Sequence, residues 1–199
     1  DVAMTAKILQ LVNSAFFGLS RHVASPAEAA TILGLDIIKS LVLSNAVFNA
    51  FPDTSANLDL EQLTSFSQQV GIIAGKLAKH EGLPRKQCDL AVMCGMLHQC
   101  GKLILAAHLD VSYKNINEQH LWQNEQEQVG ITHAEAGAYL LGIWGLPNPL
   151  IEAVMYYVKP SSCSNKELSL LAITHIASTL VNNLVQGEFN DQLEADLDM

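Results

Sequence analysis

Signals that start α-helices recur along this chain, and they constrain its fold more than any other feature. Ser25-Pro26-Ala27-Glu28 and Thr132-His133-Ala134-Glu135 each place a hydroxyl three residues before a glutamate, the capping-box pattern of a helix N-terminus. Ser164-Asn165-Lys166-Glu167 repeats that pattern. No segment alternates polar and apolar residues over a strand's length between turn residues. We therefore predict an all-α fold.

Glycine and proline mark where these helices should stop. We expect helices that end near Gly34, before Pro52, at Gly82 and at Gly145, and new helices that open at Asp36, Leu60, Pro84 and Asn148-Pro149, with a last one reaching Gln186. The polar residues 52 to 58 should separate two parts of one domain. The predicted organisation is an N-terminal helical lobe (1–52), a helical core (58–187) and an acidic tail (188–199).

Composition limits the partners that this chain can have. Of its 199 residues 49% are hydrophobic and only 16% are charged, which suits a large core. The formal net charge of −9 disfavours nucleic acid, and no apolar run approaches the roughly 20 residues of a membrane span. The four cysteines form no CxxC pair and no signal peptide is visible, so we expect a reduced, cytoplasmic protein. Because Asp1 falls inside a predicted helix, we expect a piece of a longer polypeptide.

The segment GMLHQCGKLIL at positions 95 to 105 carries the clearest motif. It resembles the GxLHDxGK signature of the HD superfamily of metal-dependent phosphohydrolases. His98 is present, but Gln99 stands where that superfamily has an aspartate. A neutral amide cannot act as a carboxylate that bridges a metal pair.

Longer blocks extend this resemblance over essentially the whole chain. LVNSAFFGLSR (11–21), ASPAEAATILGLDIIKSLVLS (24–44) and GITHAEAGAYLLGIWGLP (130–147) resemble the HDOD domain, the HD-related output domain of bacterial signalling proteins. The resemblance implies an N-terminal helical lobe packed on an HD-like helical core. It also implies a signalling or interaction module without established catalysis, beside receiver, cyclic-dinucleotide-turnover or kinase domains.

The same resemblance implies where the residues of the HD metal pocket lie in this sequence. Lys102, which directly follows the signature glycine, is one of them. The first histidine position falls at a glutamine, a later histidine pair is replaced by two tyrosines, and the late aspartate is replaced by a serine. In order, the pocket positions are Gln68, His98, Gln99, Lys102, His133, Tyr156, Tyr157 and Ser178. At most two imidazoles and no carboxylate remain, so we predict no metal, no cofactor and no catalytic residue.

Two rival interpretations of these residues stay open. Cys94, His98 and Cys100 could form a new thiolate–imidazole metal site, or they could be core packing around a buried helix. The old pocket could bind a nucleotide or another small molecule as a sensor, and a residual metal-dependent phosphohydrolase is the remaining alternative.

A loop near the N-terminus is the candidate interaction surface. Asn13 and Ser14 suit a helix end, where their side chains can satisfy backbone groups, and this would be a purely structural role. The functional alternative makes the loop a contact surface formed by Asn13, Ser14, Phe16, Phe17, Leu19 and Arg21. The primary hypothesis is a non-catalytic module of a bacterial response regulator or similar protein. Its partners would be neighbouring signalling domains and other proteins, and the sequence leaves a homodimer open.

Overall fold

The computed structural model describes residues 5, 8–9, 12–13, 22–49, 57–109, 111–113, 121–164 and 169–186. Over these ranges the chain is helical and forms no strand, which confirms the predicted all-α fold. In chain order the elements are α2 (Pro26–Leu33), α3 (Leu35–Asn49), α4 (Leu60–His80), α5 (Arg85–Leu97), α6 (Gly101–His108), α7 (Leu121–Val129), α8 (His133–Ile143), α9 (Asn148–Tyr156), the short 3-10 helix η3 (Pro160–Ser162) and α10 (Ser169–Gln186).

Local side-chain chemistry sets several of these boundaries as the sequence predicts. Thr132 and Glu135 form the complete reciprocal capping box at the start of α8. Ser25 accepts a hydrogen bond from the Glu28 amide at 3.1 Å, although the Glu28 carboxylate accepts from the amide of Ala24 rather than that of Ser25. The helices also end beside the expected glycines, since Gly34, Gly82 and Gly145 all have positive φ.

Other boundaries differ from the prediction. Helix α3 already begins at Leu35, so Asp36 lies inside its first turn and does not cap it. The helix predicted from Pro84 is interrupted by a turn at 98–100, which separates α5 from α6. Helix α7 had no recognised start signal and was not predicted. Three predictions fall wholly or partly outside the described residues: positions 52–56 of the polar break at 52–58, positions 165–167 of the capping box at 164–167, and the acidic tail at 188–199.

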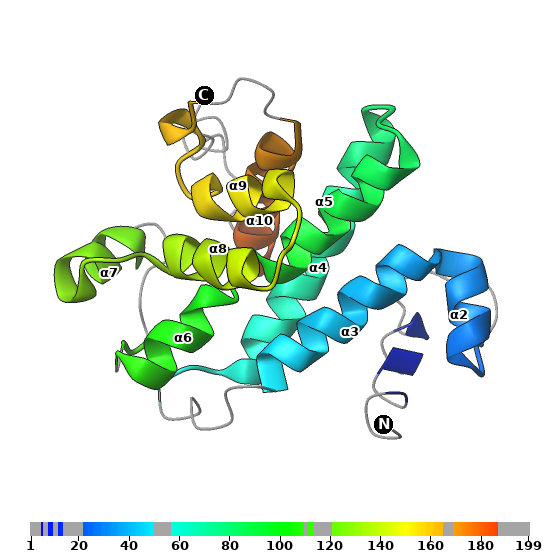
Figure 1. The fold of residues 1–199 in the computed structure, drawn as a ribbon, viewed down its shortest axis with the longest axis horizontal. Coiled ribbons are helices and arrows are strands. Elements are labelled where there is room, and N and C mark those ends of the chain that lie inside the picture. The colour runs from blue at the N-terminus through cyan, green and yellow to red at the C-terminus, as the bar shows by residue number, and fades with distance from the viewer. Residues whose placement is uncertain are drawn as a thin grey trace.

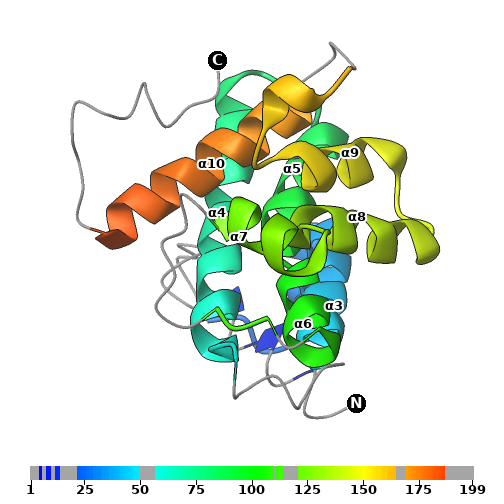
Figure 2. The ribbon, with the colours of Figure 1, turned by 90° about the vertical axis from the view of Figure 1, so that its left-hand side faces the viewer.

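Helices α4 and α5 form the centre of the fold, and α3, α9 and α10 pack directly on this pair (Figure 1). Helix α10 packs on α4, α5 and α9, while α3 packs on α5 and α2. Figure 2 shows α10 crossing α4 from the side, with α8 and α9 on the other side of the centre. Gly95 allows the central contact, because a Cβ there would lie 2.5 Å from Cα of Gly71.

Helix α6 makes a second close contact, with the N-terminal end of α8. A Cβ on Gly101 would lie 1.9 Å from the carbonyl oxygen of His133 and 2.6 Å from the amide nitrogen of Gly137. Both glycines of the GMLHQCGK segment therefore serve close helix packing. Gly101 brings the backbone that follows His98 into contact with the first turn of α8, which begins at His133.

One stretch, Arg85–His108, contains an 18-residue segment that is apolar enough to be a membrane-span candidate by length and composition. This corrects the expectation that no apolar run approaches that length. Within the protein, 78% of this segment is buried, and the turn at 98–100 divides the stretch into two helices. Burial in the helical core accounts for its apolar composition.

Candidate functional site

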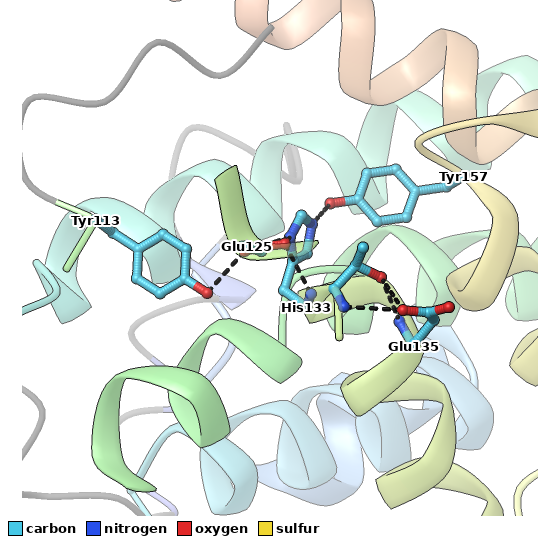
Figure 3. Close-up of polar contacts among 6 residues, drawn as sticks. Tyr113, Glu125, His133, Glu135 and Tyr157 are labelled. Atoms are coloured by element: carbon cyan, nitrogen blue, oxygen red, sulfur yellow. Dashed lines mark hydrogen bonds and ion pairs between the residues drawn. The ribbon is translucent and has the colours of Figure 1, made fainter. Parts of the chain in front are cut away.

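Both ring nitrogens of His133 are engaged by other side chains, from helices α7 and α9 (Figure 3). Nδ1 lies 2.7 and 2.8 Å from the two carboxylate oxygens of Glu125. Because a carboxylate only accepts, Nδ1 carries a hydrogen and donates it to Glu125. The other ring nitrogen, Nε2, is hydrogen-bonded to the Tyr157 hydroxyl. Both nitrogens of the imidazole are therefore occupied by side chains of this protein.

The Glu125 carboxylate receives further hydrogen bonds from two directions. The backbone amide of His133 donates to Oε2 at 2.9 Å, and the hydroxyl of Tyr113 donates to Oε1 at 2.8 Å. Burial by itself raises the pKa of this carboxyl. The charge of His133 and the hydrogen bonds from His133 and Tyr113 outweigh burial, so that the pKa lies below its ordinary value. Glu125 is thus a buried, ionised and fully hydrogen-bonded anion.

His98 lies at the junction of α5 and α6, next to the same tyrosine. Its Nδ1 lies 2.6 Å from the carbonyl oxygen of Gly95 and must donate to it, which leaves Nε2 facing the Ser178 hydroxyl at 3.4 Å. The His98 and Tyr157 rings meet edge to face with centroids 4.7 Å apart. Burial lowers the pKa of His98 to about 3, so this imidazole stays neutral at physiological pH.

The fold therefore brings four of the mapped pocket residues together, namely His98, His133, Tyr157 and Ser178. Lys102 is also buried, with its Nζ 5.5 Å from the ring centroid of Tyr113. Gln99 is buried in the turn between α5 and α6, whereas Gln68 on α4 and Tyr156 on α9 are half-buried. Among the described residues, no hydrogen bond links those three side chains to the four that meet.

Sequence reasoning missed several residues of this site. Glu125 and Tyr113 have no counterpart in the motif that pointed to the pocket, and Glu125 lies on the unpredicted helix α7. His175 was not mapped to the pocket either, and its Nδ1 donates to the carbonyl oxygen of Tyr157 at 2.7 Å. No local signal singles out Glu125, because the same helix also carries Glu127.

The two cysteines of the rival metal-site hypothesis lie in the protein interior. Cys94 and Cys100 are fully buried, and burial raises the pKa of each thiol to about 12. Metal binding needs the thiolate, which these surroundings strongly disfavour. Cys94 also hydrogen-bonds to Thr174 of α10. Their environment is that of core residues.

The side chains at this site do not fit a catalytic metal ion. A site of the HD type needs imidazole and carboxylate ligands whose lone pairs converge on one point. Here Nε2 of His133 is hydrogen-bonded to Tyr157, and Glu125 binds the far side of the same imidazole. Over the part of the chain that the structure describes, no three His, Cys, Asp or Glu side chains are grouped to hold a metal ion.

Only part of the candidate interaction loop is described. Asn13 is held by the chain: its Nδ2 donates to the carbonyl oxygens of Leu9 and Val23, each at 2.8 Å, and its Oδ1 accepts from the Val23 amide. This side chain ties the turn after residue 12 to the segment that enters α2. Ser14, Phe16, Phe17, Leu19 and Arg21 lie outside the described residues.

Similar solved structures have the same helical architecture. They include a proposed phosphohydrolase from Shewanella amazonensis SB2B (24% identity, TM-score 0.76, covering 98% of this chain and 72% of that one). An HDOD domain protein of unknown function from Geobacter sulfurreducens follows (21%, TM-score 0.70, 90% and 62%). The MmoQ response regulator of Methylococcus capsulatus (strain Bath) is a third (20%, TM-score 0.58, 98% and 79%). The fold is that of the HD-like helical proteins.

Within that class, the sequence itself assigns the family. The profile of the HDOD domain matches residues 1–160, and the chain belongs to the HDOD domain family. A protein of Treponema pallidum (strain Nichols) is 28% identical over an alignment of 163 residues that covers 79% of this chain. The match covers 31% of that relative, so the chain spans about a third of its length.

Proposed function

We propose that this HDOD domain is a non-catalytic signalling module that acts by binding other protein domains. The observation that carries the proposal is the hydrogen bond between Tyr157 and Nε2 of His133. That phenol occupies the nitrogen that a catalytic metal would need, and Gln99 supplies an amide where a bridging carboxylate is required. Metal-assisted hydrolysis therefore lacks both its ligands and its water-activating centre.

The second part of the proposal concerns the larger protein that contains the module and its place in the cell. We propose that the domain works in the cytoplasm as part of a longer bacterial regulator of the response-regulator kind, whose other domains alter its packing. Three observations support this: the match spans about a third of its Treponema relative, MmoQ shares the fold, and the chain has a net charge of −9. That charge also argues against nucleic acid as a partner.

The decisive experiment measures metal content and hydrolysis together. Untagged protein purified without chelator is analysed by plasma mass spectrometry for iron, manganese and zinc, then assayed on phosphomonoesters and phosphodiesters with each metal added. We expect far less than one metal per chain and no turnover. Stoichiometric metal with metal-dependent turnover would overturn the proposal and restore the phosphohydrolase alternative.

A pair of variants sharpens this test. Gln99→Asp restores the carboxylate alone, and Gln99→Asp with Tyr157→His also replaces the phenol on His133 with an imidazole. If Tyr157 blocks the metal position, only the double variant should gain metal affinity. Equal metal binding by the single variant would show that the phenol is not the obstacle.

A further inference from the structure

Helix α7 is attached to the core in a way that differs from the other helices. Of its nine residues only Leu121 and Glu125 are buried, and they lie four apart on one stripe. Gln126, Glu127 and Gln128 are exposed. In Figure 1 this helix lies at one end of the molecule, away from α4, α5 and α10. One of its two buried anchors is therefore a carboxylate, and the other is a single leucine.

The apolar contacts near α7 belong to a small separate cluster. Leu105, Val111 and Ala136 form its buried centre, and Val129 at the end of α7 packs against them. The large core that holds α4, α5, α8, α9 and α10 together includes no residue of α7. Trp122 adds one contact from the other side, with the Lys159 ammonium 5.7 Å from its ring centroid. Little apolar area therefore opposes the release of this helix.

The hydrogen bonds of the Glu125 carboxylate compensate for the small apolar contact of α7. It accepts from the His133 ring, from the His133 backbone amide and from Tyr113, so every interaction that holds it is a charge-assisted hydrogen bond. Its charged surroundings are His133 on α8 and, through the Tyr113 ring, Lys102 on α6. An attachment of this kind is strong while the charge is present and weak without it.

We propose that α7 is a detachable strap, latched to the start of α8 by Glu125, and that its release is a discrete local opening of the domain. Release uncovers the Nδ1 side of His133 and the first backbone amide of α8. It also frees one partner of the imidazole to which Tyr157 is bonded, so the opening is transmitted to α9. That a partner domain recognises the released strap rests on the proposed signalling function. The detachment of the strap does not depend on that function.

Hydrogen exchange followed by mass spectrometry tests the strap in the full-length protein. In the unmodified protein, we expect amides of α7 and the amide of His133 to exchange through a local opening that low denaturant barely changes, whereas those of α4 and α5 exchange only through global unfolding. Identical protection of α7 and α4, with the same denaturant dependence, would overturn the proposal without any variant.

A matched pair of variants isolates the latch. Glu125→Gln keeps the shape of the side chain and removes its charge, and Glu127→Gln makes the same change at an exposed position of the same helix. We expect Glu125→Gln to speed exchange in α7 at least about tenfold and to leave α4 and α5 nearly unchanged. No change in Glu125→Gln, or an equal change in Glu127→Gln, would contradict the latch.

The two proposals fail separately. The metal and turnover measurements do not depend on α7, and the exchange measurement does not depend on whether the domain hydrolyses anything. Faster exchange of α7 in a protein that also proves to bind metal would retain the strap and discard the non-catalytic function.

Discussion

The hydroxyl of Tyr157 is hydrogen-bonded to Nε2 of His133, and this bond joins two side chains that are 24 residues apart and at most 5% exposed. The same tyrosine packs its ring against His98, and its carbonyl oxygen accepts from His175. A single residue at the end of α9 thus links α5, α8 and α10. The position that could have held another metal ligand instead holds the centre of a hydrogen-bonded network.

Tyr157→Phe should destabilise the domain by about 1–3 kcal/mol, because it leaves the buried Nε2 of His133 without its hydrogen-bond partner. Tyr156→Phe makes the same chemical change one residue earlier, at a half-buried position, and should change stability by less than about 0.5 kcal/mol. Urea denaturation followed by circular dichroism measures both. Equal losses in the two variants would show that the His133–Tyr157 bond contributes nothing particular.

Gly101→Ala should be among the most damaging single substitutions, costing about 3 kcal/mol or more. The new Cβ would lie 1.9 Å from the His133 carbonyl oxygen. Because that atom belongs to the backbone of α8, the overlap can be relieved only if α6 and α8 move apart. Gly142→Ala on α8 is the control, since its Cβ would meet only Cδ1 of Ile151 at 3.8 Å. That variant should be neutral or up to about 1 kcal/mol more stable. The midpoints of chemical denaturation compare the two directly.

Acid should remove the contribution of Glu125 to stability. The pKa of Glu125 is lower in the folded protein than in the unfolded chain, so the folded state binds its proton less readily. This contribution is complete above the unfolded pKa of about 4.3 and is lost as the pH falls through the folded value. The difference in free energy of unfolding between the unmodified protein and Glu125→Gln should therefore stay constant from pH 7 to about pH 5 and shrink below about pH 4. A difference that grows on acidification would contradict an ionised Glu125.

Asn13→Ala should loosen the entry into α2. It removes the side chain that bonds both the amide and the carbonyl of Val23, whose own side chain is fully buried. A loss of about 2 kcal/mol corresponds, for a chain of this size, to a fall in Tm of roughly 4–8 °C. Calorimetry measures it, with exposed His22→Ala as the neighbouring control. An unchanged Tm would leave Asn13 available for the contact role suggested by its loop.

Much of the fold could be predicted because helix ends depend on residues within about four positions of one another. Ser25, Thr132, Gly34, Gly82 and Gly145 act where the local pattern places them. Asp36 shows the limit of this reasoning, since a good capping residue does not act as one when the helix has already begun before it. Helix α7 shows the converse, because a helix without a recognised start signal still formed.

The site could be predicted only in part, for a related reason. The motif identified His98 and His133, and the family pattern pointed to Tyr157 and Ser178. It could not identify Glu125 or Tyr113, because nothing in LWQNEQEQV distinguishes the buried Glu125 from the exposed Glu127 two residues later. Which of two glutamates faces inward depends on how the helix docks, and that is a tertiary property.

By itself, the sequence determined that this chain is helical, where several of its helices begin and end, and that Gln99 stands in place of a metal-binding carboxylate. Only the tertiary structure decided that Tyr157 would engage His133, that Glu125 would pin α7, and that the signature glycines would serve helix packing. Capping and residue identity act within one turn of chain, whereas the hydrogen bonds of Glu125 and Tyr157 to His133 join residues 8 and 24 positions apart, and that of Ser178 to His98 joins residues 80 positions apart. Their partners are chosen by the packing of helices against one another, which no local pattern records.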